Sequence, residues 1–274
     1  MLNIYLRLSI TIGILILSSL LTACHTVPVT GRAALSMASE DDVIKMSAEA
    51  FQSIKNQNPI SRNPKYTAIV KKVGKRIADA NSWDILNADW EFIVFEDPDR
   101  ANAFALSGGK VGVFSGLFRI VESEEDLAVV IGHELAHVAA KHVNEKLSQD
   151  MLIRGGAAAA SIATGGQGYI TQSIVLNAYG LGSQLGTYAF TRKKEMEADH
   201  IGLIYMARAR YDPRQAIDFW ERMNKETEGK PVPPQWLSTH PFHEDRVLLL
   251  HKHMPQAVEA FERGSGGSRI QVIQ

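Results

Sequence analysis

The fold is decided by residues 123–147, SEEDLAVVIGHELAHVAAKHVNEKL. Ser123 precedes three acidic residues, a pattern typical of a capped helix start, because the serine hydroxyl can accept a hydrogen bond from a first-turn amide. The apolar residues that follow form one stripe, which predicts a helix running to about Leu147. His133 and His137 are four residues apart, so both imidazoles would project from one face of that helix. Two imidazoles in this register can bind one zinc ion.

Glu134 lies between the two histidines, about 100° around the helix from His133. We expect it beside the metal and not on it. Zinc lowers the pKa of a water molecule towards 7, so a neighbouring carboxylate can act as the general base. These residue types can also occur together by chance, but the capped apolar helix around them favours a metal site.

A catalytic zinc ion needs a third protein ligand and one open position. His142 is a candidate, but on a continuous helix it would point away from His137, so we expect a surface histidine or one that supports a ligand. Glu195 and Asp199 form a better pair, four residues apart on a second predicted helix. We expect Glu195 to ligate zinc and Asp199 to accept a hydrogen bond from a ligand imidazole. Glu197 should then be solvated. An acidic helix start would also explain these carboxylates, but a pair four residues apart that follows the HELAH helix favours the metal role.

The HELAH motif (133–137) followed by an ExxxD pair resembles the gluzincin arrangement of zinc peptidases. Residues 191–199 (TRKKEMEAD) are similar to peptidase family M48, which includes the Ste24 and Oma1 peptidases and several periplasmic lipoproteins. Residues 102–105 (NAFA) and 238–241 (STHP) also resemble that family. The resemblance covers roughly residues 39–253 and implies a zinc metalloendopeptidase with a zincin-type fold and a strand above the active-site helix.

The resemblance also implies roles that the residues alone do not establish. The strand would bind substrate backbone by β-augmentation, through the residues Asn102, Ala103, Phe104 and Ala105. His240 would approach the metal, where it could donate to the oxyanion of the reaction or occupy the open position in a resting enzyme. The substrates implied are misfolded or unassembled envelope proteins, with a possible link to envelope assembly machinery.

The first 24 residues are typical of an export signal. Arg7 precedes the uncharged run 8–20, and small residues precede Cys24. Residues 21–24 (LTAC) resemble the bacterial lipobox, in which the cysteine is acylated. His25 after the cysteine, in place of aspartate, suggests the outer membrane facing the periplasm. A transmembrane anchor is the alternative, but the apolar run is shorter than the roughly 20 residues that span a bilayer.

The remaining pattern predicts an α+β protein, mainly helical with one small sheet. The net charge of −1 shows no basic excess, so we expect no nucleic-acid partner. We expect a signal peptide (1–23), an irregular linker (24–38), a peptidase domain (39–255) and a C-terminal tail (256–274). Within the domain we expect elements at 39–56, 66–80, 90–95, 102–106, 110–114, 123–147 and 195–210, one after Asp212, and one from His243.

Three questions stay open at this point. The uncharged segment 155–191 could be a pair of buried helices, which we favour, or a lid or a membrane contact. The protein could be a binding module with a structural zinc ion, although it has no second cysteine and such a site gives Glu134 no purpose. It could also be a cell-wall amidase, but the Glu195–Asp199 pair and the edge strand favour peptide substrates.

Overall fold

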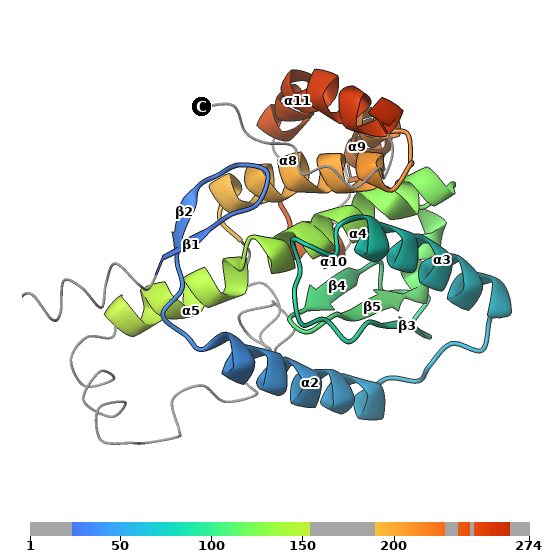
Figure 1. Cartoon of the computed structure of the whole chain (residues 1–274). Helices are drawn as coiled ribbons and strands as arrows, with labels where there is room; N and C mark the ends of the chain where they lie inside the picture. Colours follow the sequence, from blue (N-terminus) through green and yellow to red (C-terminus); the bar gives the residue numbers. More distant parts are fainter. Residues whose placement is uncertain (1–23, 154–189, 228–234, 242–243, 264–274) are drawn as a thin grey trace, which may run out of the picture.

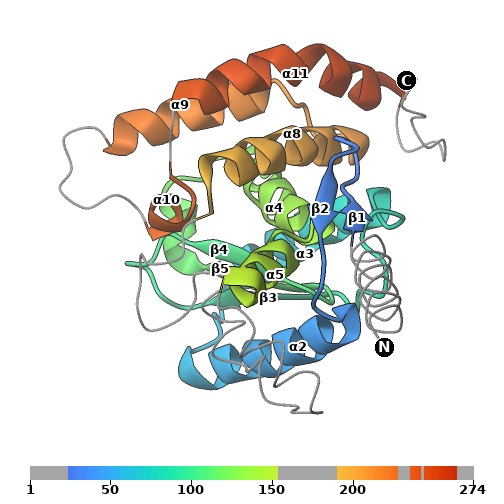
Figure 2. The same cartoon turned by 90° about the vertical axis from the view of Figure 1, so that its left-hand side faces the viewer.

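The computed structural model of the chain describes residues 24–153, 190–227, 235–241 and 244–263. The fold class is confirmed as α+β. The described helices are α2 (Glu40–Gln57), α3 (Pro64–Ala80), α4 (Glu124–Ala139), α5 (His142–Ile153), α8 (Arg192–Arg208), α9 (Gln215–Thr227), α10 (Gln235–Thr239) and α11 (Glu244–Arg263), with a 3-10 turn at Ser115–Arg119. Figures 1 and 2 show them stacked in layers: α2, the sheet, α3 with α4, then α8, then α9 with α11.

The central sheet has three strands in the order β3-β5-β4. They are β3 (Glu91–Phe95), β4 (Ala103–Leu106) and β5 (Lys110–Phe114). The predicted hairpin is confirmed: β4 pairs antiparallel with β5, and β5 pairs parallel with β3. Gly108 and Gly109 form its turn with φ near +81° and +83°, a region that glycine enters at little cost. Strand β4 is therefore an edge strand of this sheet.

Both faces of the sheet are buried. Alternate side chains of a strand point to opposite faces, and each face packs into its own core. Ala103, Ala105 and Val111 join the large core formed with α3, α4 and α8. Phe104 and Leu106 point the other way, into a smaller core under α2. The alanines of β4 are small, which lets α4 pack closely against this strand and places the HELAH helix directly beside the sheet edge.

Helices α4 and α8 meet at two glycines. A Cβ atom on Gly202 would lie 2.8 Å from the backbone nitrogen of His133, and a Cβ on Gly132 would lie 3.0 Å from the carbonyl oxygen of Gly202. Only glycine allows two helix backbones to approach so closely. The crossing brings the predicted ligands of both helices to one place.

The predicted single helix from Ser123 to Leu147 is wrong at its middle. Helix α4 begins as expected, with Ser123 accepting from the amide of Asp126, but it ends at Ala139 and α5 starts at His142. Lys141 between them has φ of +52°, in the left-handed region. Nothing in the Ala-Ala-Lys sequence favours a break, so the cause is tertiary: the turn buries His142 completely in the interior.

The amino-terminal segment is also more ordered than the predicted linker at 24–38. Strand β1 (Cys24–Thr26) pairs antiparallel with β2 (Ala33–Leu35), and Figure 2 shows this hairpin beside α5 and the start of α8. Val27 and Ala34 are buried in the large core. Cys24 itself is exposed.

Other boundaries follow the predictions closely. Ser39 caps α2, and α3 begins with a proline at its first turn. The expected domain boundary at 255 falls inside α11, which continues to Arg263. The predicted signal peptide at 1–23 and residues 155–189 of the uncharged segment lie outside the described residues. Among the described helices, none is long and apolar enough to cross a bilayer.

Candidate active site

Four buried side chains converge where α4 crosses α8. His133 and His137 come from α4, Glu195 from the first turn of α8, and His240 from the end of α10. One ligand atom of each lies within 4.8 Å of every other. The Nε2 atoms of His133 and His137 are 3.1 Å apart, and His240 Nδ1 is 3.1 Å from Glu195 Oε1.

These four residues fit a zinc ion. Zinc prefers imidazole nitrogen and carboxylate oxygen in a tetrahedral arrangement, and bonds near 2.0–2.1 Å place neighbouring ligand atoms roughly 3.3 Å apart. The distances of His133 Nε2 to Glu195 Oε2 and of His137 Nε2 to Glu195 Oε1 are 3.4 and 3.5 Å. Two facing imidazole nitrogens beside a buried carboxylate are the donor set that zinc binds.

Asp199 lies where the sequence predicted it, behind a metal-site histidine. Its Oδ1 accepts a hydrogen bond of 2.9 Å from His133 Nδ1. The guanidinium of Arg246 holds both carboxylate oxygens, at 2.6 and 2.7 Å. Burial raises the pKa of Asp199, but Arg246 outweighs burial and lowers it. Arg246 is fully buried, and its contact with Asp199 was not among the predictions made from the sequence.

The structure corrects the predictions for His142 and Glu197. His142 does not point away from the metal pair: its Nδ1 lies 2.9 Å from His137 Nδ1, so of the two expected roles it has that of a histidine that supports a ligand and not that of a surface histidine. Glu197 is not solvated, since its Oε2 lies 3.0 Å from His142 Nε2. Both errors follow from assuming a continuous helix through Lys141, because the break at that residue turns His142 back towards His137.

The protonation of this pair is set by burial and hydrogen bonds. Burial lowers the pKa of His142, although its hydrogen bond to Glu197 opposes the shift. Burial raises the pKa of Glu197, but hydrogen bonds from His142, Arg32 and Thr30 outweigh it and bring the value to about 2. At neutral pH the pair is therefore a neutral imidazole beside a carboxylate.

Glu134 is buried beside the four ligands and not among them. Its Oε1 accepts a hydrogen bond of 2.7 Å from Trp236 Nε1, and it lies 3.3 Å from His240 Nε2. Trp236 was not among the predicted site residues, because nothing in its local sequence indicates a polar contact. Helix α10 thus holds Trp236, the partner of Glu134, and His240 directly follows its last residue.

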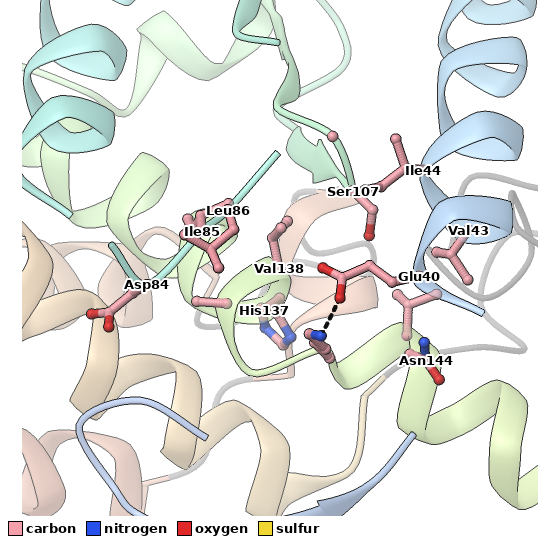
Figure 3. A pocket seen from close by; sticks show the side chains of 14 residues that line it. Glu40, Val43, Ile44, Asp84, Ile85, Leu86, Ser107, His137, Val138 and Asn144 are labelled. Carbon is pink, nitrogen blue, oxygen red and sulfur yellow. Dashed lines mark hydrogen bonds and ion pairs between the residues drawn. The ribbon is translucent and has the colours of Figure 1, made fainter. Parts of the chain in front are cut away.

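The predicted substrate strand lies next to this cluster. Asn102 precedes β4, and Ala103, Phe104 and Ala105 are buried within it. A cavity of about 40 Å³ lies beside His137, between α2, the β4–β5 turn and the α4–α5 junction (Figure 3). An ion pair between Glu40 and Lys141 borders it. The cavity has room for water but not for a peptide.

The comparison with known families agrees with this geometry. The model of "Peptidase family M48" matches residues 64–253, which contain α4, α8 and all four residues of the cluster. The chain belongs to peptidase family M48. It is an M48 metalloendopeptidase with a metal site formed by His133, His137, Glu195 and His240.

Curated relatives of this M48 peptidase come from both mitochondria and bacteria. It is 34% identical to the mitochondrial metalloendopeptidase OMA1 of Schizosaccharomyces pombe, over 86% of this chain and 68% of that protein. It is 30% identical to human OMA1, over 95% of this chain and 51% of that protein. It is 28% identical to the beta-barrel assembly-enhancing protease of Escherichia coli, over 82% and 46%. The chain therefore spans about half the length of the human and Escherichia coli proteins.

Proposed function

We propose that this M48 peptidase is a zinc endopeptidase that hydrolyses misfolded or unassembled proteins of a bacterial cell envelope. The observation that carries the proposal is the position of Glu134: a buried carboxylate directly beside a buried His-His-Glu cluster, next to an edge strand. Zinc bound to His133, His137 and Glu195 would supply the Lewis acidity that activates water and polarises the scissile carbonyl.

The protein's own groups then have separate tasks. Glu134 Oε2 is the oxygen not held by Trp236, and it takes the proton from the attacking water and passes it to the leaving amine. Asp199 and Arg246 keep the ring of His133 in one orientation. Strand β4 offers backbone groups of residues 102–105 to an extended peptide, which gives affinity with little sequence selectivity.

His240 supports two versions of this proposal. Its Nε2 faces Glu134 and its Nδ1 faces Glu195 and His133, at 3.1 and 3.2 Å. In that place it can stabilise developing negative charge on the substrate, or it can complete a four-ligand metal site and hold the enzyme at rest.

The four-ligand version is also compatible with a second candidate function, in which the protein binds other proteins without cutting them. A metal site closed by four protein ligands is typical of structural zinc, so the protein could be an envelope binding module that does not cut. This candidate rests on the position of His240 alone.

The experiment that tests the proposal uses the chain from residue 24 onward with Cys24→Ser, beside the same protein with Glu134→Gln. We expect the first to cleave unfolded casein in an EDTA-sensitive way and the second to lose at least about 100-fold in rate. Each should contain about one zinc ion. Undiminished cleavage by Glu134→Gln would refute the base assignment. Zinc in both proteins with cleavage by neither would favour the binding module or the resting state, and His240→Phe would separate these two.

The location is part of the proposal. The LTAC motif at 21–24 supports acylation of Cys24 and attachment to a membrane, with the outer membrane facing the periplasm as the expected side. The name of the Escherichia coli relative supports a link to envelope assembly machinery. Mass spectrometry of Cys24 in protein purified from bacterial membranes tests this: an unmodified cysteine behind an intact leader would contradict it.

A further inference from the structure

The two histidines of α4 are both supported from behind, but in different ways. His133 donates from Nδ1 directly to the carboxylate of Asp199, which the guanidinium of Arg246 holds. His137 has no carboxylate within reach of its Nδ1 among the contacts of the described residues. Its Nδ1 faces a second imidazole, that of His142.

The hydrogen-bonding pattern of His137 and His142 fixes both tautomers. His137 Nε2 must be unprotonated to bind metal, so its proton is on Nδ1. That proton points at His142 Nδ1, 2.9 Å away, which must therefore accept. The proton of His142 is then on Nε2 and points at Glu197 Oε2, 3.0 Å away. The chain of hydrogen bonds that starts at His137 therefore ends on a carboxylate, as the one from His133 does. It passes through one additional imidazole, that of His142.

Glu197 is held from the other side by the amino-terminal hairpin. Arg32, in the turn between β1 and β2, places Nε at 3.0 and 2.9 Å from the two carboxylate oxygens and Nη2 at 2.7 Å from Oε2. Thr30 donates to Oε1 at 2.7 Å. A guanidinium in this fork geometry fixes the plane of a carboxylate as well as its position. Arg32 also bonds Glu145 on α5, at 2.9 and 3.1 Å.

Each of the two metal-site histidines of α4 is thus connected to an arginine through a carboxylate of α8. The two carboxylates, Glu197 and Asp199, are two residues apart on that helix. One arginine, Arg246, comes from α11, and the other comes from a hairpin that precedes the whole matched region 64–253. The chain of hydrogen bonds from His137 through His142 and Glu197 to Arg32 therefore joins a segment outside that region to a side chain of the metal site.

We infer that His142 and Glu197 are positioning residues for His137, and that Arg32 makes the amino-terminal hairpin part of the metal site. His142 and Glu197 hold the His137 ring so that Nε2 faces the metal, and Arg32 keeps Glu197 in place. The inference rests on the proposed assignment of His137 as a zinc ligand, but it needs no particular substrate.

The test compares two carboxylates that share Arg32. Glu197→Gln removes the charge on the line to His137, whereas Glu145→Gln removes an equivalent partner of Arg32 that lies off this line. We expect Glu197→Gln to weaken zinc binding about 10–100-fold, measured by competition with a chromophoric chelator. It should also shift the visible spectrum of the Co²⁺-substituted protein. Glu145→Gln should leave both within about 2-fold of wild type.

Arg32→Gln is the second variant, because a side chain in a turn can be changed with little risk to folding. We expect it to weaken zinc binding in the same direction as Glu197→Gln, by a smaller factor. The melting temperature of each metal-free protein serves as the control for purely structural damage.

The outcomes separate the inference from the proposed function. Wild-type protein that binds no zinc would overturn both. Wild-type protein that binds zinc and cleaves casein, with unchanged zinc affinity in Glu197→Gln and Arg32→Gln, would overturn the positioning roles only. If Glu197→Gln and Glu145→Gln weakened zinc binding equally, the positioning role of His142 and Glu197 would also be overturned, because attachment of the hairpin alone would then explain the effect.

Discussion

At the scale of single residues, Glu134, the proposed general base, is held by a tryptophan from a different part of the chain. Trp236 is fully buried, stacks on Trp220 and donates its only side-chain N–H to Glu134. The contact leaves one carboxylate oxygen of Glu134 committed and the other available. A hydrogen bond to a charged group contributes about 1.5–3 kcal/mol, so its loss should be measurable in the rate.

We expect Trp236→Phe to lower kcat about 10-fold with little change in zinc content, because phenylalanine keeps most of the ring packing but donates no hydrogen bond. Steady-state cleavage of a peptide substrate measures this. Phe219→Leu is the matched control, since Phe219 packs against Trp236 and offers no donor. If both variants lose the same factor, packing and not the hydrogen bond is responsible.

Residue spacing predicted the part of the site that lies on regular helices. His133 and His137 are one turn apart on α4, and Glu195 and Asp199 one turn apart on α8, so each pair could be read from the sequence. Glu197 falls between the members of a pair and could not be assigned, because its partners are His142 and Arg32. Those contacts depend on a left-handed residue and on a hairpin, and neither has a local sequence signal.

At the scale of elements, the site depends on how closely α4 and α8 approach each other. Gly202 of α8 lies against the backbone of Gly132 and His133. The ligands belong to the same stretches of both helices, so the distance between the helix axes also sets the distance between His133 and Glu195.

We expect Gly202→Ala to lower the melting temperature by about 2–12 °C, because overpacking costs about 1–3 kcal/mol and each kcal/mol shifts the melting temperature of a domain of this size by about 2–4 °C. It should also reduce zinc affinity, since the added methyl group would push His133 away from α8. Lys193→Ala, an exposed change on α8, should do neither. Normal stability and zinc binding in Gly202→Ala would show that the crossing can relax without moving the ligands.

The elements themselves were largely predictable. Ser39 and Ser123 mark helix starts that the structure confirms, and the Gly108–Gly109 turn marks the hairpin. The failures are the end of α4 and the β1–β2 hairpin. Both depend on burial in the finished fold, of His142 in one case and of Val27 in the other, and burial of that kind leaves no periodic pattern.

At the scale of the whole molecule, the outer layer responds to pH at a contact between α8 and α11. His253 of α11 stacks on His200 of α8 with ring centroids 3.5 Å apart. Burial lowers the pKa of His200, and burial together with the charges of His200 and Lys252 lowers that of His253 to about 4. Gln256 bonds His200, and the charge of Glu197 opposes the shift of His200. The folded protein thus binds fewer protons than the unfolded chain below about pH 6.5.

Folding stability from this contact is therefore complete above about pH 6.5 and is lost as the pH falls towards 4. We expect His253→Gln to lose about 2 °C less in melting temperature than wild type between pH 7.5 and 5. The difference is small because His253 is only half-buried. His251→Gln, at an exposed position of the same helix, is the control. Parallel pH dependences of wild type and His253→Gln would rule out this contribution.

The place of Cys24 in strand β1 bears on the reach of the enzyme. A flexible linker of n residues has a root-mean-square end-to-end distance of about 5–6 Å multiplied by the square root of n. Here Cys24, the residue proposed to carry the lipid, is paired with Leu35 in a hairpin packed on the catalytic domain. Almost no flexible linker therefore separates the lipid from the domain. The anchored enzyme would work at a fixed height above the bilayer, and it would sample only those chains that emerge within one molecular diameter of the membrane surface.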